Sequence, residues 1–130
     1  MSGFRQLSIG LVIALSACAR SDALSDEARS VAPEQAKQLD QAYWTLLKAE
    51  KCARLAADQQ AVAEHLFRTS QIAARAQAAG LGQRLLDTQT KWTHFDETAD
   101  WVCGSGDRLA VLASSVDAFD KSVSQALGNR

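Results

Sequence analysis

Residues 109–128 read LAVLASSVDAFDKSVSQALG and predict the best-defined helix of the chain. The large apolar residues recur at intervals of three or four, which keeps them on one helical face for about five turns. They are Leu109, Leu112, Val116, Phe119, Val123 and Leu127, and Gly128 ends the pattern. Two interpretations of this seam are open. It packs into the core of a helical bundle, or it forms one wall of a groove that receives a partner helix.

The composition of the whole chain indicates an all-α fold. Alanine is abundant, and glutamine, leucine, lysine, arginine and glutamate supply most of the rest, whereas Pro33 is the only proline. No stretch shows the β-branched alternation of a strand. The length suits one small domain. We therefore predict a small four-helix bundle at residues 33–130, with three or five helices as the neighbouring possibilities.

Two helices are predicted between Pro33 and Gly80. Pro33 suits the first helical position, and Asp58 suits an N-cap, so we expect a break at residues 56–60 instead of one helix that continues to Ala79. Gly80 suits the left-handed position that ends a helix. The apolar residues of the first helix are Leu39, Tyr43, Leu46, Leu47, Cys52, Ala53 and Leu55. Those of the second are Val62, Ala63, Leu66, Phe67, Ile72, Ala73 and Ala74.

A third helix is predicted from Gln83 to about Trp92. Residues 93–98 suit either a continuation of this helix or a loop. A short apolar cluster at residues 99–103 and the turn Gly104-Ser105-Gly106 follow. Ser105 or Asp107 can cap the last helix.

The N-terminal stretch resembles the signal peptide of a bacterial lipoprotein. Arg5 precedes an apolar run that is too short to span a bilayer and that ends in Leu15-Ser16-Ala17-Cys18. This ending resembles a lipobox. The resemblance implies removal of residues 1–17, a diacylglyceryl thioether on Cys18, and acylation of the freed amine by a fatty acid such as palmitate. Ala19, where an aspartate would favour the inner membrane, implies a position in the inner leaflet of the outer membrane, facing the periplasm.

The segment at residues 18–32 is polar, and we expect it to be a flexible tether between the lipid and the domain. With Cys18 assigned to the lipid, Cys52 and Cys103 remain. A pair of cysteines in an oxidising compartment predicts a disulfide, and two buried thiols are the alternative. A metal site is disfavoured because the two cysteines are far apart and neither His65 nor His94 sits at ligand spacing. We expect no cofactor beyond the covalent lipid.

The sequence lacks the motifs of common catalytic sites. It has no glycine-rich phosphate loop, no nucleophile elbow and no His-Glu-x-x-His. The histidines suit a helix surface or the core, the acids at residues 96–100 suit a solvated face or a cap, and the three tryptophans suit the core or its rim. The formal net charge of −1 gives no support for nucleic-acid binding. No small-molecule substrate is evident, so we expect a binding protein and not an enzyme.

The order of these features resembles the small helical pilotins of type II secretion, the PulS/OutS-like lipoproteins. Four features carry the resemblance: the lipobox at Cys18, Ala42-Tyr43-Trp44 followed by Cys52, a second helix that ends in Ala73-Ala74-Arg75-Ala76-Gln77-Ala78-Ala79-Gly80-Leu81, and Cys103 before the last helix. Two features depart from the pilotin pattern. Gly80-Leu81 stands where Gly-Trp is expected, and Ala53-Arg54-Leu55-Ala56 stands after Cys52, where a more polar, turn-like segment is expected.

The resemblance implies a protein partner, namely a C-terminal secretin segment that folds as a helix in an apolar groove. The lipid would then carry the secretin to the outer membrane for assembly. The candidate groove residues are Tyr43, Trp44, Leu47, Leu112, Val116 and Phe119. Two alternatives bind other proteins. One is an immunity or exclusion lipoprotein. The other is an inhibitor of a cell-wall hydrolase, which would need a long loop.

Overall fold

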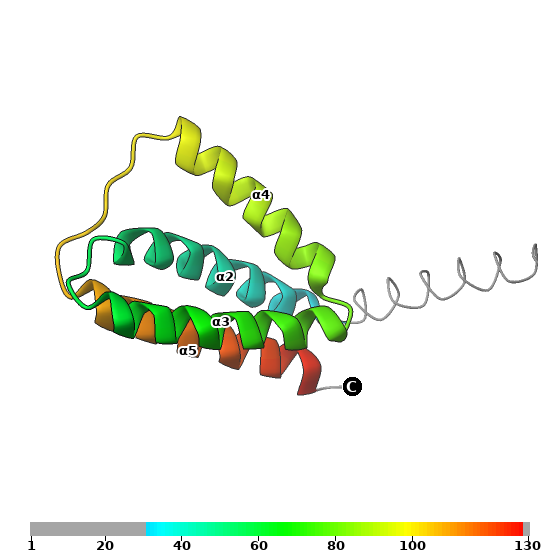
Figure 1. The fold of residues 1–130 in the computed structure, drawn as a ribbon. Helices are drawn as coiled ribbons and strands as arrows, with labels where there is room; N and C mark the ends of the chain where they lie inside the picture. The colour runs from blue at the N-terminus through cyan, green and yellow to red at the C-terminus, as the bar shows by residue number, and fades with distance from the viewer. Residues whose placement is uncertain (1–30, 129–130) are drawn as a thin grey trace, which may run out of the picture.

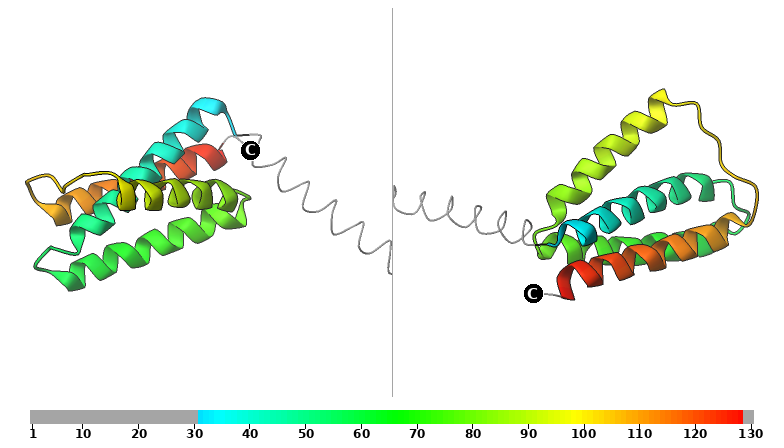
Figure 2. Two further views of the ribbon diagram at one scale, coloured as in Figure 1. Left: turned by 90° about the horizontal axis from the view of Figure 1, so that it is seen from above. Right: turned by 180° about the vertical axis from the view of Figure 1, so that it is seen from behind.

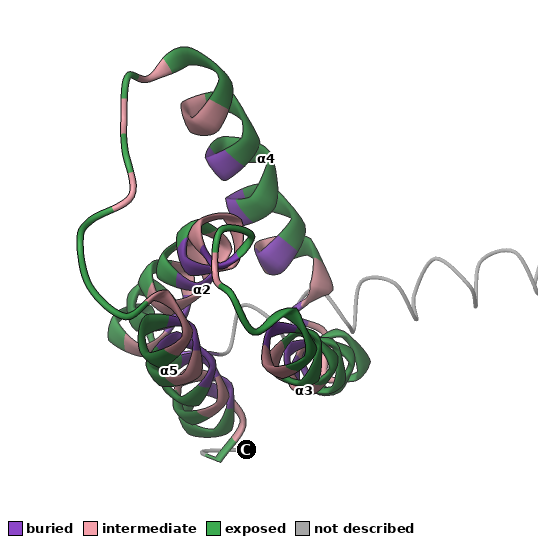
Figure 3. Cartoon of the chain, turned by 60° about the vertical axis from the view of Figure 1, so that its left-hand side comes forward, coloured by how far each residue is buried: buried purple, intermediate pink, exposed green. Residues whose placement is uncertain are grey.

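The computed structural model describes residues 31–128, which form four α-helices and no strand (Figure 1). The helices are α2 (Pro33–Ala53), α3 (Gln59–Ala78), α4 (Gly82–Thr98) and α5 (Arg108–Gly128). Helix α2 is central: α5 and α4 pack on different sides of it, and α3 packs on α5 (Figure 3). The prediction of an all-α, four-helix domain is confirmed.

The core lies mainly between α2 and α5, which share the most extensive interface (Figure 2). Helix α2 contributes Leu39 and Leu46, and Leu81 joins them from the turn before α4. The seam of α5 contributes four fully buried side chains, those of Leu112, Val116, Phe119 and Val123. Each such side chain stabilises the fold by about 1.5–3 kcal/mol relative to its exposed state. The seam of the last helix is therefore core.

The predicted break between the first two helices is confirmed. The Asp58 carboxylate accepts a hydrogen bond of 3.0 Å from the backbone N–H of Ala61 and so caps α3. The side chain of Gln59 donates to the Ala56 carbonyl at 2.6 Å and to the Ala53 carbonyl at 3.2 Å. The short loop at residues 54–58 therefore connects α2 to α3.

Gly80 ends α3 as predicted. Its φ is +92°, a region that disfavours residues with a Cβ. The Leu81 N–H donates to the Ala76 carbonyl at 3.0 Å, and the Gly80 N–H donates to the Gln77 carbonyl at 3.1 Å. This pair of bonds is a Schellman motif, and its usual apolar contact is supplied by the buried side chains of Leu81 and Ala76.

Ion pairs join α3 to α5 on the surface. Arg68 contacts Asp117 at 2.5 Å and Asp120 at 3.3 Å, and Arg75 contacts Asp120 at 2.6 Å. The Arg75 bond, together with that of Arg68, holds the pKa of Asp120 below its usual value. These ion pairs connect α3 to α5, but they contribute little to the free energy of unfolding because their side chains are exposed.

Helix α4 continues through residues 93–98 to Thr98, which decides between the two possibilities left open for that segment. The structure differs from the sequence-based expectation at other places. Phe67 and Leu55, assigned to apolar stripes, are exposed, and Leu66 is partly so. Val31, assigned to the tether, is buried against the core. The signal peptide, the lipid site at Cys18 and residues 18–30 of the tether lie outside the described residues.

Candidate protein-binding site at the disulfide strap

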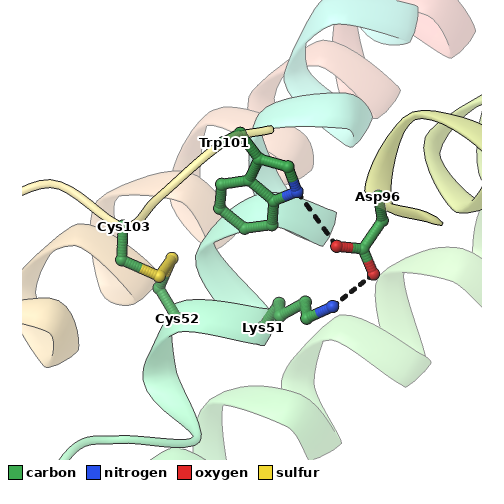
Figure 4. Close-up of a disulfide and its surroundings, with 5 residues drawn as sticks. All are labelled: Lys51, Cys52, Asp96, Trp101 and Cys103. Carbon is green, nitrogen blue, oxygen red and sulfur yellow. Dashed lines mark hydrogen bonds and ion pairs between the residues drawn. A yellow bond between two sulfur atoms is a disulfide. The ribbon is translucent and has the colours of Figure 1, made fainter. Parts of the chain in front are cut away.

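The connection between α4 and α5, residues 99–107, lies across the end of α2, and we call it the strap. A disulfide holds it there: Cys52 in the last turn of α2 bonds Cys103 of the strap, with an S–S distance of 2.04 Å and a Cα–Cα distance of 5.7 Å (Figure 4). The predicted pairing is confirmed. The strap lies at the opposite end of α2 from Pro33 (Figure 1). The last helix begins immediately after the strap, with Asp107 as its N-cap.

Four aromatic side chains pack together beneath the strap. They come from α2 (Trp44), α4 (Trp92 and Phe95) and the strap (Trp101). The ring centroids lie 5.2 Å apart for Trp44–Trp92 and 5.3 Å apart for Trp92–Trp101, both near an edge-to-face arrangement. Such pairs add about 0.5–1.5 kcal/mol to the burial of the rings. This cluster fixes α4 and the strap to α2.

A polar network continues the aromatic cluster. The indole N–H of Trp101 donates to Asp96 Oδ1 at 3.0 Å, and Lys51 Nζ lies 2.5 Å from Asp96 Oδ2 (Figure 4). The hydrogen bond from Lys51, followed by that from Trp101, holds the pKa of Asp96 below its usual value. The ammonium groups of Lys48 and Lys51 lie 5.5 Å and 5.9 Å from the Trp101 ring centroid. Both carboxylate oxygens of Asp96 are therefore engaged, one by the strap and one by α2.

Two pockets lie beside the disulfide. The first, between α2 and α5, has a volume of about 260 Å³, and we call it the α2–α5 pocket. It is lined by Thr45, Lys48, Ala49, Cys52, Gly104, Ser105, Gly106, Arg108 and Val111. The second has a volume of about 400 Å³ and is lined by Lys51, Arg54, Leu55, Asp96, Ala99, Trp101 and Cys103. Both are therefore partly walled by residues of the strap or the turn within it.

Exposed apolar side chains surround these pockets. Val102, next to Cys103, is 82% exposed, Leu55 of the second pocket is 68% exposed, and Val111 of the α2–α5 pocket is 53% exposed. Apolar surface gathered around pockets is typical of sites that bind other proteins. The strap end of the bundle is therefore the candidate binding site.

The structure separates the predicted groove residues into two groups. Leu112, Val116 and Phe119 have no exposed surface, because α2 already covers the seam of α5. They cannot contact a partner in this conformation. The other three lie on α2 and are half-buried. The Tyr43 ring stacks on that of Phe119, with centroids 5.0 Å apart, and Trp44 belongs to the aromatic cluster. Leu47 lies five residues before Cys52, the residue of α2 that is bonded to the strap.

Cys52 and the turn Gly104-Ser105-Gly106 of the α2–α5 pocket were identified from the sequence, but its other lining residues were not. Lys48 and Ala49 precede Cys52 by one turn of α2, and Arg108 and Val111 follow the turn after Cys103. Once Cys52 and Cys103 are paired, these neighbours must come together. The predicted Cys52–Cys103 pairing could have indicated that these residues are neighbours. It could not have indicated which of the residues next to each cysteine line a pocket.

Two half-buried carboxylates lie on α2, but they are not a catalytic pair. Burial raises the pKa of Glu50 to about 7, and Arg54 opposes this shift. Burial also raises the pKa of Asp40, opposed by Arg84, whose guanidinium lies 3.3 Å away. Ten residues of helix place the two acids about 15 Å apart, too far to share a proton or a substrate bond.

Within residues 31–128, no three histidine, cysteine or acidic side chains are arranged to hold a metal ion. In the same part of the chain, no helix combines the length and the apolar character needed to cross a membrane. His94 is exposed and His65 half-buried, both on helices. Comparison with protein-family models, with curated proteins and with solved structures found no match in any of the three.

Proposed function

We propose that the protein is a lipid-anchored adaptor that binds a short segment of a partner protein at its strap end, with a secretin C-terminal segment as the candidate partner. The observation that carries this proposal is the α2–α5 pocket, with exposed Val111 on its wall and exposed Val102 on the adjoining strap. The side chain of one bound residue suits a pocket of this size, as expected for the anchor of a docked peptide.

The position of the pocket along α2 supports this role. Cys52 lies nineteen residues after Pro33, which corresponds to about 28 Å of helix. A lipid on Cys18 would hold the Pro33 end of the bundle toward the membrane. The strap end would then face the periplasm, where it could bind a secretin subunit before the subunit assembles.

The rigidity of the strap also supports segment binding. The disulfide and the Trp101–Asp96 hydrogen bond fix the pocket wall before any partner arrives. A disordered segment that folds on binding loses conformational entropy, so a fixed receptor surface improves the affinity. A hydrolase inhibitor would instead need a loop that projects into an active-site cleft, and the strap is held against the bundle.

The experiment is replacement of Cys18 by serine in the producing bacterium. We expect the secretin to remain in the inner membrane or to be degraded, because its adaptor has lost the anchor. Fractionation followed by detection of heat-resistant secretin multimers measures this. Ser21→Ala in the tether is the matched control. Normal secretin assembly in the Cys18→Ser strain would contradict the proposal.

A further inference from the structure

We infer that the α2–α5 pocket selects an acidic amphipathic segment, one in which a carboxylate lies beside the apolar anchor residue. This inference rests on the proposed function and names the chemistry of its partner. It follows from the charges that line the pocket and from the absence, within residues 31–128, of any acidic group paired with them.

The lining of the pocket is mainly apolar. Ala49 and Cys52 come from α2, Val111 comes from α5, and the turn Gly104-Ser105-Gly106 also contributes to the lining. Gly106 has a φ of +126°, and a Cβ at that position would meet no atom within 4 Å. The space next to Gly106 is therefore unoccupied by other atoms of the described chain.

The charged residues of the lining are both cations. Lys48 reaches the pocket from α2, and Arg108 reaches it from the first turn of α5. Neither forms an ion pair with any residue between 31 and 128. The cations that bridge helices elsewhere in that range each have an acidic partner: Lys51, Arg68, Arg75 and Arg84. Lys48 does lie 5.5 Å from the Trp101 ring centroid, but this contact leaves its positive charge uncompensated. Neither pocket cation is paired with an acidic group of residues 31–128, so both can attract a carboxylate from outside.

Backbone N–H groups at the N-terminus of α5 are already bonded within the chain and are not free to bind a partner carboxylate. Asp107 Oδ1 accepts from the N–H groups of Leu109 at 3.0 Å and of Ala110 at 3.2 Å. These two N–H donors, which a bound anion would otherwise use, are occupied. Recognition of a partner carboxylate in the pocket is therefore assigned to the side chains of Lys48 and Arg108, which come from two different helices.

The test measures the affinity of the full-length chain for two labelled peptides by fluorescence anisotropy. Each has about 15 residues, long enough for an amphipathic helix, with leucine along one face. One carries glutamate beside the leucines, and the other has glutamine in place of each glutamate. We expect the glutamate peptide to bind at least about fivefold more tightly at low salt, with the difference reduced at high salt.

Charge reversal locates the effect. The double variant Lys48→Glu with Arg108→Glu should lose at least about tenfold in affinity for the glutamate peptide, since two attractive contacts become repulsive. Lys121→Glu is the control, because it changes a cation on the exposed face of α5 well away from the pocket. Circular dichroism and thermal unfolding verify that each variant is folded.

Equal affinities for the two peptides would overturn the inference, as would undiminished binding by the folded double variant. Failure of the glutamate peptide to bind at about 1 mM would also overturn it. The proposed function is judged separately. If secretin assembly needs Cys18 but tolerates the double variant, the charge inference falls and the adaptor function stands. The reverse pattern leaves an acidic-segment site with another partner.

Discussion

Trp101 and Asp96 are joined by a hydrogen bond from the indole nitrogen to Oδ1, 3.0 Å long, across the point where α4 becomes the strap. Trp101 also packs against Trp92, so one side chain links the aromatic cluster to the polar network. The strap is therefore fixed at two places, by the disulfide at Cys103 and by this bond.

Replacement of Trp101 by phenylalanine keeps an aromatic ring and removes the donor. We expect faster amide hydrogen exchange in the strap, a lower melting temperature, and a rise in the pKa of Asp96 because one of its two side-chain donors is lost. Trp44→Phe is the control, since the Trp44 indole donates no hydrogen bond to residues 31–128. Equal strap exchange rates in the two variants would show that the bond does not hold the strap.

Loss of the disulfide should cost a large part of the stability. Cys52 and Cys103 are 51 residues apart, and the chain-entropy model for a loop of this size gives about 4 kcal/mol. We expect the double variant with serine at both positions to have a free energy of unfolding that is lower by about 4 kcal/mol. It should therefore unfold at a lower urea concentration. A reducing agent should lower the midpoint of the natural chain and leave that of the double variant unchanged. Identical midpoints for oxidised and reduced protein would contradict this prediction.

Two phenylalanines offer a matched test of the core. Phe119 is fully buried and stacks on Tyr43, whereas Phe67 is 65% exposed on α3. We expect Phe119→Ala to lower the free energy of unfolding by about 3–5 kcal/mol, and Phe67→Ala to change it by no more than about 0.5 kcal/mol. Chemical denaturation measures both. A cost at Phe67 similar to that at Phe119 would mean that the Phe67 side chain is buried and not exposed on α3.

Glu50 should make the stability depend on pH near neutrality. Its pKa is raised from 4.5 to about 7 by burial, so the folded state holds a proton that the unfolded state releases. The stabilisation is complete below pH 4.5 and is lost as the pH rises through about 7. With allowance for solvent screening, Glu50→Gln should exceed the natural chain in stability by about 1–2 kcal/mol at pH 8 and match it at pH 4.

The control for Glu50 is Glu64→Gln, the same chemical change at an exposed position of α3. It should shift the stability little, because the Glu64 side chain is exposed. Thermal unfolding at intervals from about pH 4 to about pH 8 distinguishes the two variants. A pH-independent difference between Glu50→Gln and the natural chain would show that Glu50 titrates normally in the folded state.

The helices were predictable because their signals are local. The spacing of the α5 seam, the cap at Asp58 and the glycine at position 80 each depend on residues within a few positions, and all three agree with the structure. The continuation of α4 to Thr98 was not decided, because residues 93–98 have no strong helical preference. Packing of Trp92 and Phe95 against α2 favours the helix there.

The candidate site was less predictable because it depends on which helices meet. Periodicity showed that α5 has an apolar face, but not that α2 would cover Phe119 and Val116 completely. The same limitation applies to Phe67, whose apolar neighbours suggested a buried stripe although α3 turns it outward. The pocket cations Lys48 and Arg108 are 60 residues apart, and the packing of α2 on α5, together with the disulfide, brings them to one opening.

The bond between Cys52 and Cys103 also closes α3 and α4 into a covalent ring. A protease that cuts once anywhere within residues 53–102 therefore cannot separate the chain into two diffusing pieces. The fragment that carries α2 would stay attached to the one that carries α5, and these two helices hold most of the core. A single cut in α3 or α4 therefore leaves the α2 and α5 walls of the α2–α5 pocket in one covalently linked molecule.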